Sequence, residues 1–173
     1  YKGYSNFKTK DTINGHTPFH LASISKTFTG MAVLSLWEDG KISLDDKLQK
    51  YFPQLPYHGI TIKMLLSHRR GLPNYVYFID SSWDRHKEMT NEDVLNALIF
   101  HHPRIQNLPD RGFQYCNTNF MLLALIVEKI TGEDFPDYMR ENIFEPLGMN
   151  DTYIFSIKDT AHYNPTWSVS RPF

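Results

Sequence analysis

Ser23 and Lys26, two side chains that could carry out nucleophilic chemistry, lie three positions apart. On a helix this offset places both side chains on one face. At a helix N-terminus, the free backbone N–H groups and the helix dipole would favour negative charge developing beside Ser23. Lys26 could take the hydroxyl proton if its ammonium group is desolvated or lies near another cation. The same residues also allow an N-cap serine followed by a solvated lysine.

Tyr115 and Asn117 form a second pair, directly before the most apolar stretch of the chain. In extended backbone, side chains two positions apart point the same way. A phenol held near Lys26 could act as a base or a proton relay, and the Asn117 carboxamide could bind a substrate amide. Alternatively, Tyr115 packs in the core and Asn117 caps the next helix. For Cys116, between them, a free structural thiol is favoured over a nucleophile because no His partner is recognisable.

Helices must position these pairs, because helical periodicity with start and stop signals dominates from residue 23 to about residue 144. Residues 1–22 carry turn signals instead, and we expect one or two strands or extended segments there. The expected helices run from Ser23 to the stop at Gly40, from the capping box at Ser43 to a point before Pro53, from Ile62 to His68, from Thr90 to Pro103, from Thr118 to Ile130, and from Asp134 to Phe144.

Two tryptophans and one unpatterned stretch are further candidates for the core and for a pocket. On the first helix, Ile24, Phe28, Met31 and Leu34 recur at helical spacing, and we expect the neighbouring Trp37 to pack in the core. Residues 72–90 lack a pattern and are predicted to form a long surface loop. In that loop, Trp83 is a candidate pocket residue.

Composition and charge exclude several classes of function. The 173 residues include 18 Lys plus Arg and 19 Asp plus Glu, a formal net charge of −1. This balance argues against a nucleic-acid partner, which needs a strong positive field. No apolar run is long enough for a transmembrane segment. The adjacent His101 and His102 would diverge on a helix, and no paired-cysteine or His-Glu-x-x-His motif occurs, so neither a metal nor a cofactor is predicted.

Taken jointly, the motifs resemble one family over about residues 15–155. The chain is similar to the class C β-lactamase-like branch of the serine β-lactamase and penicillin-binding-protein superfamily, which includes esterases and D-amino-acid peptidases. The segments that carry the resemblance are Phe19–Thr27, Asp39–Asp46, Tyr51–Pro53, Ile60–His68, Gly71–Pro73, Tyr115–Phe120 and Glu145–Met149.

The resemblance implies roles for four residues. Ser23 would be the acylated nucleophile, and its N–H would form half of an oxyanion hole. Lys26 would activate Ser23, Tyr115 would act as base and then as proton donor to the leaving group, and Asn117 would orient the substrate. The implied function is a serine hydrolase that attacks an amide or ester carbonyl. The implied partner is a small molecule or peptide: a β-lactam, an ester or a D-amino-acid peptide.

The resemblance also implies an α+β fold, a helical subdomain with part of an antiparallel sheet. Residues 1–173 would form a single β-lactamase-like domain, with extended segments at 1–22, a helical part at 23–150 and a return toward the sheet at 151–173. The family's third motif, Lys-Thr-Gly or His-x-Gly, is missing, so we expect the domain to be incomplete at its C-terminal side. A catalytically inactive member or fragment that serves as a binding or structural module is the alternative. Export to the periplasm is suggested by the resemblance only.

Overall fold

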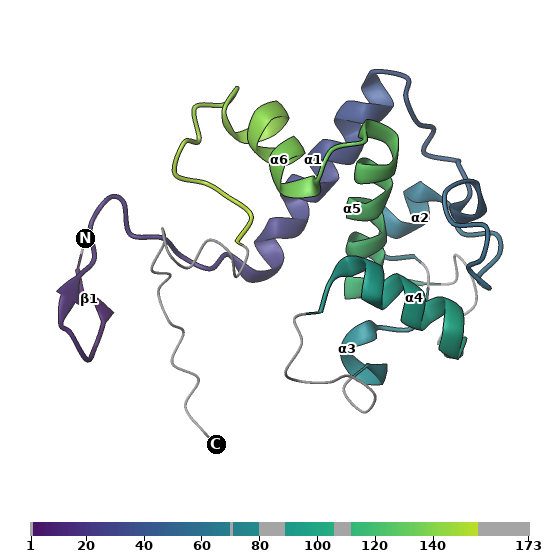
Figure 1. Ribbon diagram of the computed structural model, residues 1–173, viewed down its shortest axis with the longest axis horizontal. Coiled ribbons are helices and arrows are strands. Elements are labelled where there is room, and N and C mark those ends of the chain that lie inside the picture. The colour runs from purple at the N-terminus through teal and green to yellow at the C-terminus, as the bar shows by residue number, and fades with distance from the viewer. Residues whose placement is uncertain (1, 70, 80–88, 106–111, 156–173) are drawn as a thin grey trace.

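The computed structural model describes residues 2–69, 71–79, 89–105 and 112–155, and these residues are mostly helical (Figure 1). The strands are β1 (Tyr4–Asn6) and β2 (Asp11–Thr12), which pair as a small antiparallel sheet. The helices are η1 (Ala22–Ile24), α1 (Ser25–Glu38), η2 (Leu48–Lys50), α2 (Ile62–Leu66), α3 (Tyr75–Phe78), α4 (Asn91–His101), α5 (Asn117–Thr131), α6 (Phe135–Met139) and η3 (Arg140–Phe144).

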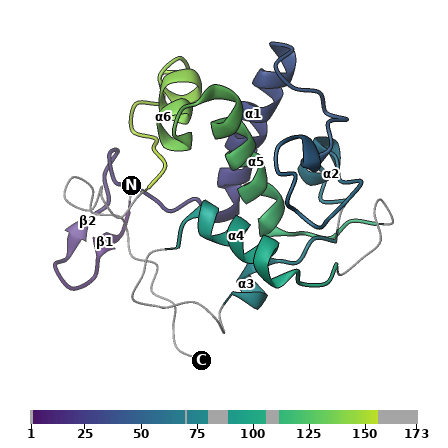
Figure 2. The ribbon, with the colours of Figure 1, turned by 45° about the vertical axis from the view of Figure 1, so that its right-hand side comes forward.

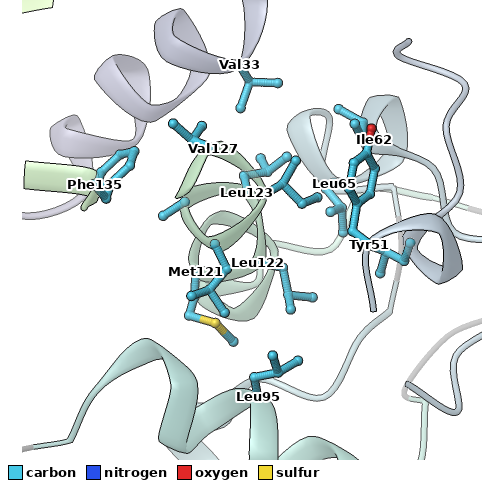
Figure 3. Close-up of a cluster of buried hydrophobic side chains, with 14 of the residues drawn as sticks. Val33, Tyr51, Ile62, Leu65, Leu95, Met121, Leu122, Leu123, Val127 and Phe135 are labelled. Carbon is cyan, nitrogen blue, oxygen red and sulfur yellow. The ribbon is translucent and has the colours of Figure 1, made fainter. Parts of the chain in front are cut away.

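Helix α5 is the centre of the core. Its residues 118, 119 and 121–127 are all buried, and it ends at Gly132, whose φ of +76° suits a residue without a Cβ. Helices α1, α2, α3, α4 and α6 all contact it. Figure 3 shows Val33 of α1, Leu65 of α2 and Leu95 of α4 reaching toward α5 from different sides. The predicted buried helix at 118–130 is therefore confirmed, because a helix that is apolar all round needs neighbours on every face.

Helix α1 packs against α5 with a face that the periodicity did not indicate. Its buried residues are Thr29, Ala32, Val33 and Leu36. The stripe predicted from the sequence is largely exposed instead: Ile24 at 60%, Met31 at 41% and Leu34 at 43%. Trp37 is 49% exposed, so its predicted core position is wrong. The helix carries apolar residues on two faces, and spacing alone cannot say which of the two is covered.

The predicted short helix after Ser43 is largely a turn. The Ser43 N–H donates to the Asp46 carboxylate at 2.9 Å, as in a capping box, and the Asp46 N–H donates to the Ser43 carbonyl at 3.0 Å. Only the 3₁₀ turn η2 follows. The reason is that the Asp46 carboxylate also accepts from the Tyr51 hydroxyl at 2.6 Å, which closes the segment into a compact turn.

Residues 72–79, the first part of the stretch predicted as a surface loop, do not form one. Leu72 is fully buried, and α3 follows it. The Thr118 hydroxyl of α5 donates to the Pro73 carbonyl at 2.6 Å and accepts from the Tyr75 N–H at 3.0 Å. These bonds tie the segment to the core helix. Trp83, the candidate pocket residue, lies outside the described residues.

The hairpin of β1 and β2 lies to one side of the helices in both views (Figures 1 and 2). Extended segments at 1–22 were expected, and the hairpin confirms part of that expectation. At the other end of the chain, α6 and η3 together span the helix predicted at 134–144. A return toward the sheet was expected at residues 151–173. Residues 156–173 of that segment lie outside the described part. No helix among the described residues is long and apolar enough to cross a membrane.

Candidate active site

Ser23 lies in the 3₁₀ turn η1, directly before α1. The preceding residue, Ala22, has a φ of +49°, a left-handed conformation that residues with a Cβ rarely adopt. The N-cap of α1 is Ile24, so Ser23 does not cap the helix. Its hydroxyl is exposed and engaged with other side chains. The alternative of an N-cap serine is therefore wrong for this chain.

Two side chains donate hydrogen bonds to the same Ser23 oxygen. The Lys26 Nζ, one turn into α1, donates to Ser23 Oγ at 3.2 Å. The Tyr115 hydroxyl donates to Ser23 Oγ at 2.6 Å. Helices α1 and α5 both begin at the same end of the helical body (Figure 1), which is how a tyrosine 92 positions away reaches Ser23. The structure thus brings together three of the four residues singled out from the sequence.

Lys26 controls the electrostatics of Tyr115. Its ammonium nitrogen lies 4.9 Å from the centroid of the Tyr115 ring. Hydrogen bonding to Lys26, followed by the hydrogen bond to Ser23, lowers the pKa of the Tyr115 phenol. Tyr115 is 45% exposed, so it does not pack in the core as the alternative required. A phenol whose ionised form is stabilised and which already touches a hydroxyl is suited to accept its proton.

Asn117 is the first residue of α5, two positions after Tyr115. The N-cap of α5 is Cys116, so Asn117 does not cap the helix, contrary to the alternative. Asn117 is half-buried, and its side chain makes no hydrogen bond to any residue that the structure describes. Asn117 lies at the N-terminus of α5, close to Tyr115, but the structure shows no hydrogen bond between Asn117 and Ser23. Its role in substrate orientation stays a prediction.

Cys116 is poorly suited to be a second nucleophile. Its side chain is 1% exposed, and its Sγ donates to the Leu72 carbonyl at 3.4 Å. Burial raises the pKa of the thiol, which disfavours the reactive thiolate. These observations favour the structural thiol that the sequence indicated.

His68 is a site residue that sequence reasoning missed. Its imidazole lies against the Tyr115 ring, with centroids 4.6 Å apart. The only local signal is a titratable residue two positions after Leu66, the apolar end of α2. That signal is weak, because a buried histidine more often serves packing than chemistry.

Comparisons with known proteins agree on one family for this chain. A model of the family described as Beta-lactamase matches residues 1–168. The chain is 36% identical over 154 residues to penicillin-binding protein 4* of Bacillus subtilis (strain 168), covering 89% of this chain and 34% of that protein. The chain therefore spans about a third of the length of this curated relative.

Two solved structures have a similar fold. The D-amino acid amidase from Ochrobactrum anthropi SV3, complexed with L-phenylalanine amide, superposes with a TM-score of 0.73 at 32% identity, over 85% of this chain and 41% of that one. The octameric penicillin-binding protein homologue from Pyrococcus abyssi gives a TM-score of 0.78 at 30% identity, over 94% of this chain and 38% of that one. The family model matches nearly the whole of this chain. The chain therefore belongs to the β-lactamase family.

Proposed function

We propose that this chain provides the nucleophile of a serine hydrolase that attacks an amide or ester carbonyl through an acyl-enzyme intermediate. The observation that carries the proposal is the convergence of Lys26 and Tyr115 on Ser23 Oγ, at 3.2 and 2.6 Å. A hydroxyl is a weak nucleophile at its ordinary pKa, and a neighbouring base is what activates it. Membership of the β-lactamase family and the similarity to penicillin-binding proteins and a D-amino acid amidase support the same chemistry.

In the acylation step, the ionised Tyr115 phenolate accepts the Ser23 proton while Oγ forms a bond to the carbonyl carbon. The Lys26 ammonium stabilises the phenolate before the transfer and remains beside the phenol afterwards. The carbonyl oxygen becomes an oxyanion, for which the Ser23 backbone N–H is the donor that we propose from this chain. Collapse of the tetrahedral intermediate breaks the bond to the leaving group, and the Tyr115 phenol supplies its proton.

Hydrolysis of the acyl-enzyme reverses the same proton transfers. Tyr115, ionised again, accepts a proton from water as the water oxygen attacks the acyl carbon, and Ser23 Oγ leaves and regains a proton. Asn117, two positions after Tyr115, would hold the amide next to the scissile bond. The substrate class that we propose is a β-lactam, an ester or a D-amino-acid peptide, because all three present a carbonyl with a leaving nitrogen or oxygen.

The direct test is intact-mass spectrometry of the 173-residue chain after exposure to a fluorophosphonate, which phosphonylates an activated serine with loss of fluoride. We expect one adduct, located by peptide mapping at Ser23. Ser23→Ala should abolish the adduct, and Lys26→Ala should abolish or strongly slow it. Ser25→Ala is the matched control, because it removes a neighbouring hydroxyl that lies outside these contacts, and it should label like the parent chain.

The competing function is that of a binding or structural module without catalysis. It predicts a folded chain that forms no adduct at Ser23. It also predicts that Ser23→Ala leaves ligand binding unchanged. An adduct on another residue, with none at Ser23, would contradict the proposed function.

A further inference from the structure

His68 occupies an unusual place next to Ser23, Lys26 and Tyr115. It follows Ser67, the C-cap of α2, and its φ of +52° is left-handed. Its side chain is 8% exposed. A β-carbon in this conformation costs free energy, so the surrounding contacts must hold the residue there.

His68 accepts hydrogen bonds from the residues directly before and after Tyr115. The Gln114 N–H donates to the His68 carbonyl at 2.8 Å. The Cys116 N–H donates to His68 Nδ1 at 3.3 Å. Between these two bonds, the Tyr115 ring lies against the imidazole at a tilt of 37°. One residue therefore fixes the backbone before and after Tyr115 and also one face of its ring.

The hydrogen bonds define the protonation state of the imidazole. Besides the Cys116 N–H, the Asn119 side-chain amide nitrogen, which can only donate, lies 3.1 Å from His68 Nδ1. The same amide nitrogen donates to the Leu65 carbonyl at 3.4 Å, which fixes the orientation of the amide. Two donors converge on one ring nitrogen, so Nδ1 must be an acceptor and the ring proton lies on Nε2.

We propose that His68 is a positioning residue which, as a neutral imidazole protonated on Nε2, holds the Tyr115 hydroxyl against Ser23. Its catalytic consequence rests on the function proposed above for Tyr115. A protonated imidazole would place an N–H at Nδ1, opposite two other N–H donors, and would release the segment that carries Tyr115. The phenol would then no longer keep its 2.6 Å contact with Ser23.

The surroundings of His68 favour the neutral form. Burial lowers the pKa of His68, and the positive charge of Lys26 lowers it further. Among the described residues, the titratable groups that lie against the ring or shift its pKa are Lys26 from α1, and Tyr115 and Cys116 from the segment before α5. Phe113 and Phe120 complete its aromatic surroundings, with ring centroids 5.7 and 5.1 Å away. While the Tyr115 phenol is neutral and donates to Ser23, none of these three titratable groups carries a negative charge that would stabilise an imidazolium.

Two substitutions separate the hydrogen bond from the ring contact. His68→Asn keeps an acceptor near the place of Nδ1 and tolerates the left-handed backbone, but it loses the ring. His68→Phe keeps an aromatic ring and loses the acceptor, so the Cys116 N–H is buried without a partner. We expect fluorophosphonate labelling of Ser23 to slow about tenfold or more in His68→Phe and to stay within about threefold of the parent in His68→Asn. Equal loss in both variants would overturn the proposal.

His102 offers a matched control for backbone strain. It is also a histidine with a left-handed φ, of +46°, but it is exposed at the end of α4. His102→Phe therefore introduces the same side chain into the same backbone conformation outside the site. We expect its labelling rate to equal that of the parent chain. A slowing as large as in His68→Phe would show that strain, not the lost acceptor, is responsible, and the proposal would fail.

A measurement on the unsubstituted chain avoids the risk that a variant fails to fold. Nitrogen-15 NMR of the imidazoles should show His68 neutral near pH 7 with its proton on Nε2. As the pH is lowered, the Tyr115 ring signals, assigned with Tyr115→Phe, should shift together with the titration of His68. A proton on Nδ1, or Tyr115 signals that ignore this titration, would overturn the proposal. This readout needs no catalysis, so a chain that shows it without labelling at Ser23 would refute the proposed function while supporting the positioning role.

Discussion

The charge on Tyr115 governs what Ser23 can do, and its pH dependence is a direct consequence of the geometry. The ionised phenol is the base, and hydrogen bonds with Lys26 and Ser23 lower its pKa below the usual value of 10.0. Labelling of Ser23 should therefore rise with pH and level off below pH 10. In Tyr115→Phe the base is absent, so we expect the rate to fall about 10²- to 10⁴-fold and to lose this rise. Stopped-flow labelling across pH would measure both effects, and a Tyr115→Phe chain with the parent profile would exclude the role.

The pKa of Asp46 is also lowered by hydrogen bonds, and here the consequence is for the stability of the fold. Burial opposes its ionisation, but hydrogen bonds from Lys50, the Ser43 N–H and the Tyr51 hydroxyl outweigh it and lower its pKa to about 2. Because the folded pKa lies below the unfolded value of 3.8, the carboxylate stabilises the fold above that value and loses its effect as pH falls toward 2. We expect Asp46→Asn to lower the free energy of unfolding at about pH 7 by about 1 to 2 kcal/mol, allowing for solvent screening.

Urea unfolding at several pH values would measure the contribution of Asp46. The difference between the parent and Asp46→Asn should shrink between about pH 4 and about pH 2. Asp45→Asn, the substitution of an exposed neighbour, serves as the control for charge removal alone. A difference that is independent of pH would mean that the loss is one of packing and not of charge.

At the scale of elements, two helices, α2 and α4, begin at a threonine whose side chain accepts a local hydrogen bond. Thr90 and Asp93 form a complete capping box at α4, with the Asp93 N–H donating to the Thr90 hydroxyl at 3.2 Å and the Thr90 N–H to the Asp93 carboxylate at 2.9 Å. We expect Thr90→Ala to lower the free energy of unfolding by about 1 kcal/mol. Thr90→Ser keeps the hydroxyl and should lose much less. Thermal unfolding followed by circular dichroism would separate the two, and equal losses would contradict the capping argument.

Several helix ends, and the buried position of α5, could be predicted from the sequence because they depend on residues close together in the chain. The Thr61 and Thr90 caps, the apolar run of α5 and its end at Gly132 all act within a few residues. Two features depend on distant parts of the chain and could not be predicted in this way. His68 acts on Tyr115 across 47 positions through a left-handed backbone, and the turn at Asp46 is closed by Tyr51.

In the candidate site, residue spacing predicted the contact between Ser23 and Lys26 but not the contact of Tyr115 with Ser23. Ser23 and Lys26 lie one helical turn apart, so their contact follows from spacing. The contact of Tyr115 with Ser23 joins positions 92 apart and was expected only from the family resemblance. Chain spacing carries no information about such pairs, because the core around α5 decides which helix ends meet.

At the scale of the whole molecule, α1 has more apolar surface than its neighbours cover. One face lies against α5 through Ala32, Val33 and Leu36. The other exposes Met31, Leu34 and Trp37 beside Ile143, and these residues line a shallow hollow. A contiguous apolar surface of this kind attracts other apolar groups from solution, whereas isolated exposed residues do not.

The 173-residue chain should therefore bind a hydrophobic dye such as anilinonaphthalene sulfonate in its folded state. We expect the double substitution Leu34→Gln and Trp37→Gln to reduce dye fluorescence severalfold, because both side chains are about half exposed and belong to this surface. Glutamine is a good helix former, so α1 should persist. Phe100→Gln removes an apolar side chain that is 82% exposed on α4, and dye binding should not change. If Phe100→Gln reduces the fluorescence as much as the double substitution, the dye does not report on the α1 surface.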